Sequence, residues 1–216
     1  MRNPDLRVED FQFRRCGVKS VGCKMSRYMF CVVLAMFILS SCATHGPFYV
    51  GTPYRAPVSY GEGRHPGIDF NISVGTPIIA ASDGDVIYIG EPDPRERYGG
   101  GVFVGVSHGE HFNSLYGHMT KVFVKEGESL KRGQLIGFSG ASNNGYAHLH
   151  FGICKIGGGC KNFSETFDPK MFWLGGQPQC FNPTMDYSTY SQKEITIPVA
   201  CEDYAKKLTL ESKGKK

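Results

Sequence analysis

The stretch Ala147-His148-Leu149-His150-Phe151-Gly152-Ile153, AHLHFGI, combines the apolar character of a buried strand with two histidines one residue apart. In a strand, residues i and i+2 point to the same face, so both imidazoles are expected on one side of a sheet. Burying an imidazole without a partner is costly. Either both rings find ordinary hydrogen-bond partners in the core, or they belong to a functional site, and the rest of the chain has to decide.

Short β-prone segments precede this stretch and predict a mostly β domain. They alternate with Gly, Asn and Asp turns between about residues 61 and 155, where no amphipathic helix of normal length stands out. Strands of this length and spacing favour antiparallel sheets in a sandwich-like arrangement. The segments are TPIIAA (76–81), DVIYIG (85–90), GVFVGVS (101–107), NSLYGH (113–118), KVFVKEG (121–127), QLIGFSG (134–140) and HLHFGIC (148–154).

The N-terminus has the pattern of an exported lipoprotein. Basic residues precede an apolar run at 28–39, which is shorter than the roughly 20 residues that cross a bilayer as a helix. The following Leu39-Ser40-Ser41-Cys42 resembles the bacterial lipobox, so we expect a signal peptide over residues 1–41 and lipid on Cys42. A plain signal-anchor helix is the alternative, and Met25 is an alternative start. Residues 42–60 are then the lipidated cysteine and a tether, in which His45 is expected to be inert.

Removal of residues 1–41 balances the charge of the chain. Of the 24 Lys and Arg and the 20 Asp and Glu in the sequence, seven and three lie in this leader, which leaves 17 of each sign. No basic excess remains to favour a nucleic-acid partner.

Four cysteines follow the leader and Cys42, and an even number in an exported chain predicts two disulfides. Cys154 with Cys160, and Cys180 with Cys201, is the most local of three possible pairings. A metal site built from these four is the competing interpretation, but the CxxC pairs typical of structural zinc sites are missing.

A second histidine pattern lies upstream, in His65-Pro66-Gly67-Ile68-Asp69. Pro66 and Gly67 argue against a helix, but a loop that enters a strand can bring His65 and Asp69 to a common point. A histidine from the distant HxH strand would complete a shell of two His and one Asp. A catalytic zinc site uses about three such ligands and leaves a position open for water.

These segments together resemble peptidase family M23, the LytM or lysostaphin-type domain. The resemblance covers about residues 61–154 and rests on GRHPGIDFNISVGTPIIAASDGDVIYIG (63–90), LYGHM (115–119), VKEGESLKRGQLIGFSG (124–140) and HLHFGI (148–153). It implies a mostly antiparallel β domain over 61–160 with a zinc site in an open groove. Residues 161–216 are then an irregular, disulfide-containing C-terminal extension. Position by position, the resemblance makes His65, Asp69 and His150 zinc ligands, and His118 and His148 catalytic residues that do not bind the metal.

The resemblance implies a zinc endopeptidase that cuts peptide cross-links of bacterial peptidoglycan, with stem peptides or cross-bridges as substrate. Lipid on Cys42 implies a membrane surface, and because Ala43 rather than Asp follows, we expect the outer membrane facing the periplasm. Two alternatives come from other classes. One is a non-catalytic LytM-type regulator that binds the wall or activates another hydrolase. The other is a biotinyl or lipoyl carrier, which VKEGESLKRGQLIG resembles, although no lysine stands at a suitable tight turn.

The remaining polar residues are weighed as groove or turn residues. The run His108-Gly109-Glu110-His111 fits neither HExxH nor HxxEH and is expected in a hairpin turn. Tyr60, Tyr98 and Tyr146 are candidates to line a groove, and Asn143 and Asn144 to border it.

Overall fold

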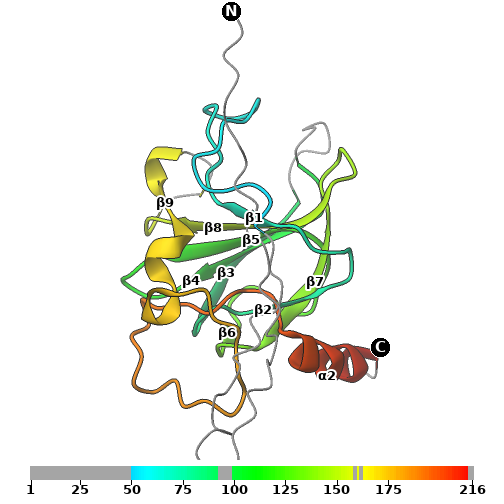
Figure 1. The fold of residues 1–216 in the computed structure, drawn as a ribbon, viewed down its shortest axis with the longest axis vertical. Coiled ribbons are helices and arrows are strands. Elements are labelled where there is room, and N and C mark those ends of the chain that lie inside the picture. Colours follow the sequence, from blue (N-terminus) through cyan, green and yellow to red (C-terminus); the bar gives the residue numbers. More distant parts are fainter. Residues whose placement is uncertain (1–49, 92–98, 158–159, 161–162, 214–216) are drawn as a thin grey trace, which may run out of the picture. The chain divides into compact units, whose positions relative to one another are not determined.

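The fold is mostly antiparallel β structure, as the strand pattern predicted (Figure 1). The computed structural model describes residues 50–91, 99–157, 160 and 163–213. The expected signal peptide, Cys42, His45 and Tyr98 lie outside these residues. The strands are β1 (Ile68–Phe70), β2 (Pro77–Ile79), β3 (Gly84–Gly90), β4 (Val102–Ser107), β5 (Asn113–Val122), β6 (Ser129–Leu130), β7 (Leu135–Ala141), β8 (Ala147–Cys154) and β9 (Thr166–Phe167).

The strands join into one branched sheet with the order β1-β8-β7-β5-β4-β3-β6. Strand β8, which carries the HxH stretch, pairs with β1, β5, β7 and β9, all antiparallel. The antiparallel arrangement that we expected is thus one continuous hydrogen-bonded network. Strand β8 has partner strands on both sides, so the positions of its side chains are fixed by the sheet.

The strand predicted at 121–127 is only partly present: Lys121 and Val122 are the end of β5, and residues 123–127 lie in no strand. No turn residue separates NSLYGH from KVFV, so the chain continues through a register shift between Met119 and Lys121. Up to Gly117 β5 pairs with β8, and from Met119 onward it pairs with β7. The sheet therefore branches at His118, immediately before the register shift.

The stretch 50–60, assigned above to the tether, is paired with the domain in the structure. Val50 forms a bridge with Phe70 and Pro57 with Arg64. The Gly51 amide donates to the Asp69 carbonyl, and the Asp69 amide to the Thr52 carbonyl. This part of the chain therefore supports the segment that contains HxxxD.

The C-terminal extension packs into the main core, although its sequence predicted no regular structure. Ile195, Ile197 and Val199 are buried there, and Ile78 on β2 forms a bridge with Val199. The Arg132 guanidinium joins the two parts, because it donates to the carbonyls of Ala81 and Glu194 at 2.8 and 2.7 Å. The helical elements here are η1 (Phe163–Glu165), η2 (Pro169–Phe172), η3 (Leu174–Gly176) and α2 (Glu202–Lys213).

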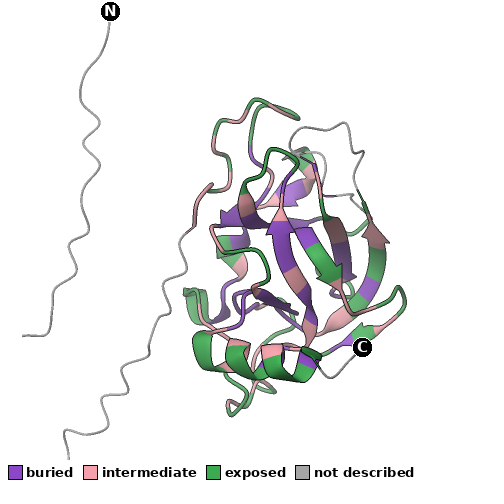
Figure 2. Cartoon of the chain, turned by 90° about the vertical axis from the view of Figure 1, so that its right-hand side faces the viewer, coloured by how far each residue is buried: buried purple, intermediate pink, exposed green. Residues whose placement is uncertain are grey.

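Helix α2 ends the described chain and packs through Leu208 against Ile79. Figure 2 shows exposed residues along the outward face of α2 and mostly buried ones in the strands. Its apolar positions are few, which explains why the sequence did not predict it. Within the described residues, no helix is both long and apolar enough to cross a membrane.

Candidate metal centre

The pairing of β1 with β8 places an aspartate opposite a histidine. In this antiparallel register Asp69 faces His150, and Phe70 faces Leu149. Paired residues project to the same face of a sheet, so the Asp69 carboxylate meets the His150 imidazole. Their Oδ1 and Nδ1 atoms are 3.0 Å apart, and both residues are buried.

His65 reaches the same point from the loop before β1. Two backbone hydrogen bonds hold this loop against residues 50–60, from the Arg55 amide to the His65 carbonyl and from the His65 amide to the Ala56 carbonyl. The His65 Nδ1 lies 3.2 Å from the Pro53 carbonyl oxygen. Because a carbonyl only accepts, Nδ1 carries the hydrogen, and Nε2 presents its lone pair to Asp69 and His150.

Three ligand atoms converge in this cluster, which we call the metal triad: His65 Nε2, Asp69 Oδ1 and His150 Nδ1. All three separations are 3.0 Å. With the hydrogen of His65 on Nδ1, only one hydrogen, that on His150 Nδ1, is available to the three atoms. The lone pairs of His65 Nε2 and Asp69 Oδ1 therefore face each other with no hydrogen between them. A cation among the three atoms satisfies every lone pair at once, so the group can hold a metal ion.

The charge states agree with this arrangement. Burial alone raises the pKa of the Asp69 carboxyl, but its contacts with the adjacent His150 and His65 imidazoles outweigh burial and hold the pKa well below its usual range. Burial lowers the pKa of the His150 imidazole, against the opposing attraction of the Asp69 carboxylate. At neutral pH Asp69 therefore offers a carboxylate and His150 a neutral imidazole, which are the forms that bind metals.

Two further buried histidines stand beside the triad. His118 and His148 lie with ring centroids 4.4 Å apart, and His148 Nε2 is 3.8 Å from Asp69 Oδ1. Each Nδ1 donates to a backbone carbonyl at 2.9 Å, that of Gly100 for His118 and that of Tyr146 for His148. Each Nε2 is therefore left as a proton acceptor. Burial, and then the neighbouring His150 and His148, lower the pKa of His118 to about 3.

The backbone at His118 is strained into place. Its φ is 60°, in the left-handed region that non-glycine residues seldom adopt. Gly101, at φ 67°, lies directly against it, since a β-carbon there would be 2.7 to 2.9 Å from backbone atoms of His118 and Met119. Position 101 therefore requires a glycine, both because of its positive φ and because a β-carbon would collide with the backbone of β5.

Comparisons with known proteins match the part of the chain that contains this cluster. The model of peptidase family M23 matches residues 63–163. The solved catalytic domain of the antimicrobial peptidase lysostaphin from Staphylococcus simulans is 32% identical, with a TM-score of 0.51, and the match covers 58% of this chain and 91% of that domain. The chain belongs to peptidase family M23.

Curated relatives match the same M23 region. Glycyl-glycine endopeptidase ALE-1 of Staphylococcus capitis is 41% identical over 46% of this chain and 26% of its own length. Peptidoglycan DD-endopeptidase ShyA of Vibrio cholerae is 36% identical over 47% of this chain and 23% of its own length. Lipoprotein YgeR of Escherichia coli K12 is 35% identical over 57% of this chain and 46% of its own length. The matched region thus spans less than half of each relative.

The structure brings the five residues selected through the M23 resemblance into one cluster: His65, Asp69, His118, His148 and His150. The other histidines in the described part of the chain, His108 and His111, lie outside it. His108 is buried between β4 and β5, where Nδ1 donates to the Asp83 carbonyl at 2.7 Å and Nε2 accepts from the Ser114 hydroxyl at 2.8 Å. It is a core residue with both nitrogens paired. His111 is exposed in the same connection, as expected for a turn.

The four cysteines form the two local disulfides, Cys154–Cys160 and Cys180–Cys201. The competing cysteine metal site is therefore not formed. The second bridge ties the segment after η3 to the start of α2.

Sequence reasoning missed the backbone carbonyls that orient the histidines. Pro53, Gly100 and Tyr146 supply these acceptors. Since any residue has a carbonyl, side-chain identity carries little signal for them. The paired glycines at 100 and 101 are the nearest hint, because such pairs mark a backbone that approaches another closely.

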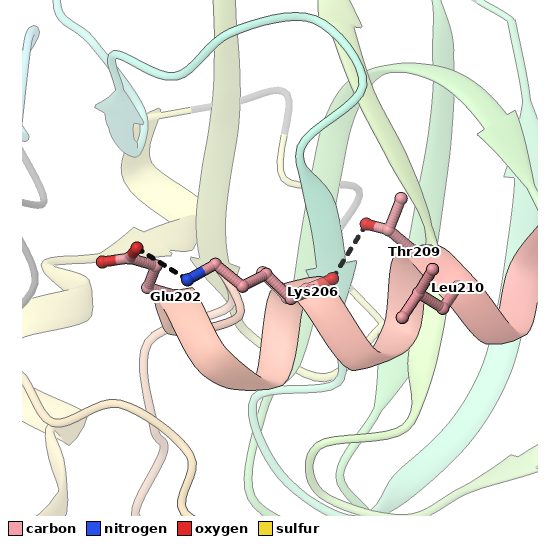
Figure 3. Close-up of a pocket in the computed structure, with 5 residues that line it drawn as sticks. Glu202, Lys206, Thr209 and Leu210 are labelled. Atoms are coloured by element: carbon pink, nitrogen blue, oxygen red, sulfur yellow. Dashed lines mark hydrogen bonds and ion pairs between the residues drawn. The ribbon is translucent and has the colours of Figure 1, made fainter.

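A separate hollow on α2 lacks the features of a site. Its lining comes from one exposed helix face, on which Glu202 pairs with Lys206 and Thr209 bonds the Ala205 carbonyl (Figure 3). Ligand sites normally draw polar groups from several elements. The histidine cluster is therefore the candidate site of this chain.

Proposed function

We propose that this chain is a zinc-dependent endopeptidase that hydrolyses peptide cross-links of bacterial peptidoglycan. The metal triad is the observation that carries the proposal. It supplies two imidazole nitrogens and one carboxylate oxygen, the ligand types that catalytic zinc takes. Zinc bonds of about 2.0–2.1 Å in a tetrahedron space the ligands by about 3.3 Å, close to the 3.0 Å found here.

His65, Asp69 and His150 would hold the ion, and the Pro53 carbonyl would keep the His65 ring in its binding orientation. When bound, zinc polarises the scissile carbonyl and lowers the pKa of a water molecule toward about 7.

His118 and His148 would act on the reacting groups. Their Nδ1 atoms are engaged by carbonyls, so each Nε2 can accept a proton from the attacking water. The same nitrogen, once protonated, can stabilise the oxyanion or return the proton to the leaving amine. Because both rings are buried, they perform these transfers without competition from bulk water. His118, with its pKa lowered by burial, begins the cycle neutral.

The substrate follows from the relatives and the expected location. ShyA is named a peptidoglycan DD-endopeptidase and ALE-1 a glycyl-glycine endopeptidase. For a bacterium with two membranes, we propose the bond from D-Ala to meso-diaminopimelate as the target, with a glycine bridge as the alternative.

The lipobox-like sequence before Cys42 supports an exported lipoprotein, and YgeR is itself named a lipoprotein. We propose that lipid on Cys42 anchors the chain to the outer membrane, facing the periplasm. Residues 43–49 then form the short link to the first described residues.

Digestion of purified sacculi tests the proposal. The full chain and His150→Ala, both in detergent, are incubated with sacculi, and released fragments are identified by mass spectrometry. We expect cross-linked dimers to become monomers with the wild type only, and the new ends name the bond that is cut. A folded, zinc-loaded wild type that releases nothing would contradict the peptidase and favour the non-catalytic regulator.

A further inference from the structure

Two side chains at the ends of the strands that carry the metal triad contact each other. Asn71 directly follows β1, and Tyr146 directly precedes β8. The Tyr146 hydroxyl donates a hydrogen bond to the Asn71 side-chain oxygen. A tyrosine and an asparagine thus bridge the two strands directly beside the histidine cluster.

The Tyr146 ring lies against a catalytic histidine. Its centroid is 4.8 Å from that of His148, and the planes are tilted by 35°. Tyr146 also accepts, through its own carbonyl, the hydrogen of His148 Nδ1. One residue therefore contacts His148 on its ring face and at its ring nitrogen.

Both ends of Tyr146 are fixed. Its carbonyl accepts the Ser142 amide at 3.1 Å, and its amide donates to the Asn144 side-chain oxygen at 3.2 Å. At the other end, Asn71 packs against the backbone of Gly51, where a β-carbon would collide with its amide group. The ring is held by its surroundings, yet 43% of the residue remains exposed, whereas His148 is 5% exposed. Tyr146 therefore covers His148 and presents its outer face to solvent.

We infer that Tyr146, anchored through its hydroxyl to Asn71, is a positioning residue for His148 and forms the wall of the substrate groove at this end. This inference rests on the proposed peptidase function. The ring restricts the swing of the His148 imidazole about its side-chain bonds, so that Nε2 stays directed at the reacting water. Its exposed face is flat and largely apolar, and the substrate peptide next to the scissile bond packs on it.

Steady-state kinetics of the full chain with cross-linked peptidoglycan peptides test the inference. Tyr146→Phe keeps the ring and loses the anchor, so we expect kcat to fall about threefold with KM unchanged. Tyr146→Ala loses both, so we expect kcat to fall at least tenfold and KM to rise. Tyr88→Ala is the matched control, because Tyr88 is 45% exposed on β3, separated from β8 by β4 and β5 in the sheet. It should keep both constants.

A double-mutant cycle tests the anchor itself. Tyr146→Phe and Asn71→Ala remove the same bond, so the double variant should lose no more than the worse single variant. Losses that multiply would overturn the anchoring.

Side-chain NMR of the His148 ring nitrogens separates this inference from the proposed function, because it needs no turnover. We expect sharp signals of the Nδ1–H tautomer in wild type and Tyr146→Phe, and exchange-broadened ones in Tyr146→Ala, with zinc content unchanged. If Tyr146→Ala retains sharp His148 signals, or loses zinc, the positioning role is overturned. If the wild type is inactive on every peptide, the proposed function fails, and the NMR comparison alone decides the role of Tyr146.

Discussion

One backbone carbonyl at each imidazole decides what that imidazole can do. His65, His118 and His148 each direct Nδ1 at a carbonyl and leave Nε2 for chemistry, whereas His108 pairs both nitrogens and has none to spare. All four residues are buried, so burial does not separate them. The partner of the second nitrogen separates His108 from the three histidines that we propose for the site.

Substitution of the two histidines outside the triad should separate binding from catalysis. We expect His118→Ala and His148→Ala each to lower kcat by about 10²-fold or more, the usual scale for a lost general acid or base, while zinc stays bound. Sacculus digestion and metal analysis on the same samples measure both. Equal loss of zinc in these variants would show that they belong to the metal shell instead.

His108 should make the folded state sensitive to acid. Burial lowers its pKa from 6.5 to about 4, so between these values the unfolded chain takes up a proton that the folded chain does not. This contribution to stability is complete above pH 6.5 and is lost as the pH falls toward 4, by up to about 3 kcal/mol. Urea unfolding of the metal-free chain at several pH values measures it.

In that experiment His108→Gln should reduce the loss of unfolding free energy between pH 6.5 and 4, while the other buried titratable groups keep their share of it. His111→Gln is the control, because His111 is exposed in the same connection and should leave the slope as in wild type. An unchanged slope in His108→Gln would contradict the assignment.

At the scale of elements, the crossing of β5 with the glycine loop before β4 determines where His118 lies. The His118 φ of 60° and the contact with Gly101 both occur at the residue where β5 changes its partner from β8 to β7. Strand alternation predicted β8 and the shared face of His148 and His150, because period-two patterns are local. It did not predict the branch in β5, which depends on two different partner strands.

Gly101→Ala tests this crossing against a matched glycine. Gly109→Ala has the same left-handed φ, 66°, but no atom within 4 Å of its β-carbon, so it should cost about 1–2 kcal/mol from the backbone alone. Gly101→Ala adds the collision with His118 and should cost clearly more, with a larger loss of sacculus cleavage. Equal effects on unfolding free energy and cleavage would show that the contact is unimportant.

At the scale of the whole molecule, the C-terminal extension completes the core of the domain. Its sequence has prolines and no period, so propensity did not predict η2, η3 or α2, and only the even cysteine count indicated order. Its order depends on distant partners: the Arg132 guanidinium donates to the Glu194 carbonyl, the Ala81 carbonyl accepts from Thr196, and Ile78 forms a bridge with Val199. The HxxxD and HxH residues, in contrast, could be selected from the sequence through the M23 resemblance.

The disulfide of this extension should contribute more stability than the shorter one. Cys180–Cys201 spans 21 residues and Cys154–Cys160 spans six, and loop-closure entropy predicts about 3 and about 2 kcal/mol respectively. Urea unfolding of Cys180→Ser with Cys201→Ser, beside Cys154→Ser with Cys160→Ser, measures the difference. A larger loss from the shorter bridge would contradict this order.

Zinc restoration tests most directly the central claim that the histidine cluster is a metal-dependent peptidase. The full chain is stripped with a chelator, zinc is added back in steps, and bound zinc and sacculus cleavage are measured on each sample. We predict that cleavage disappears with the metal and returns in proportion to bound zinc, up to about one ion per chain. Cleavage that survives complete removal of the metal would contradict the account.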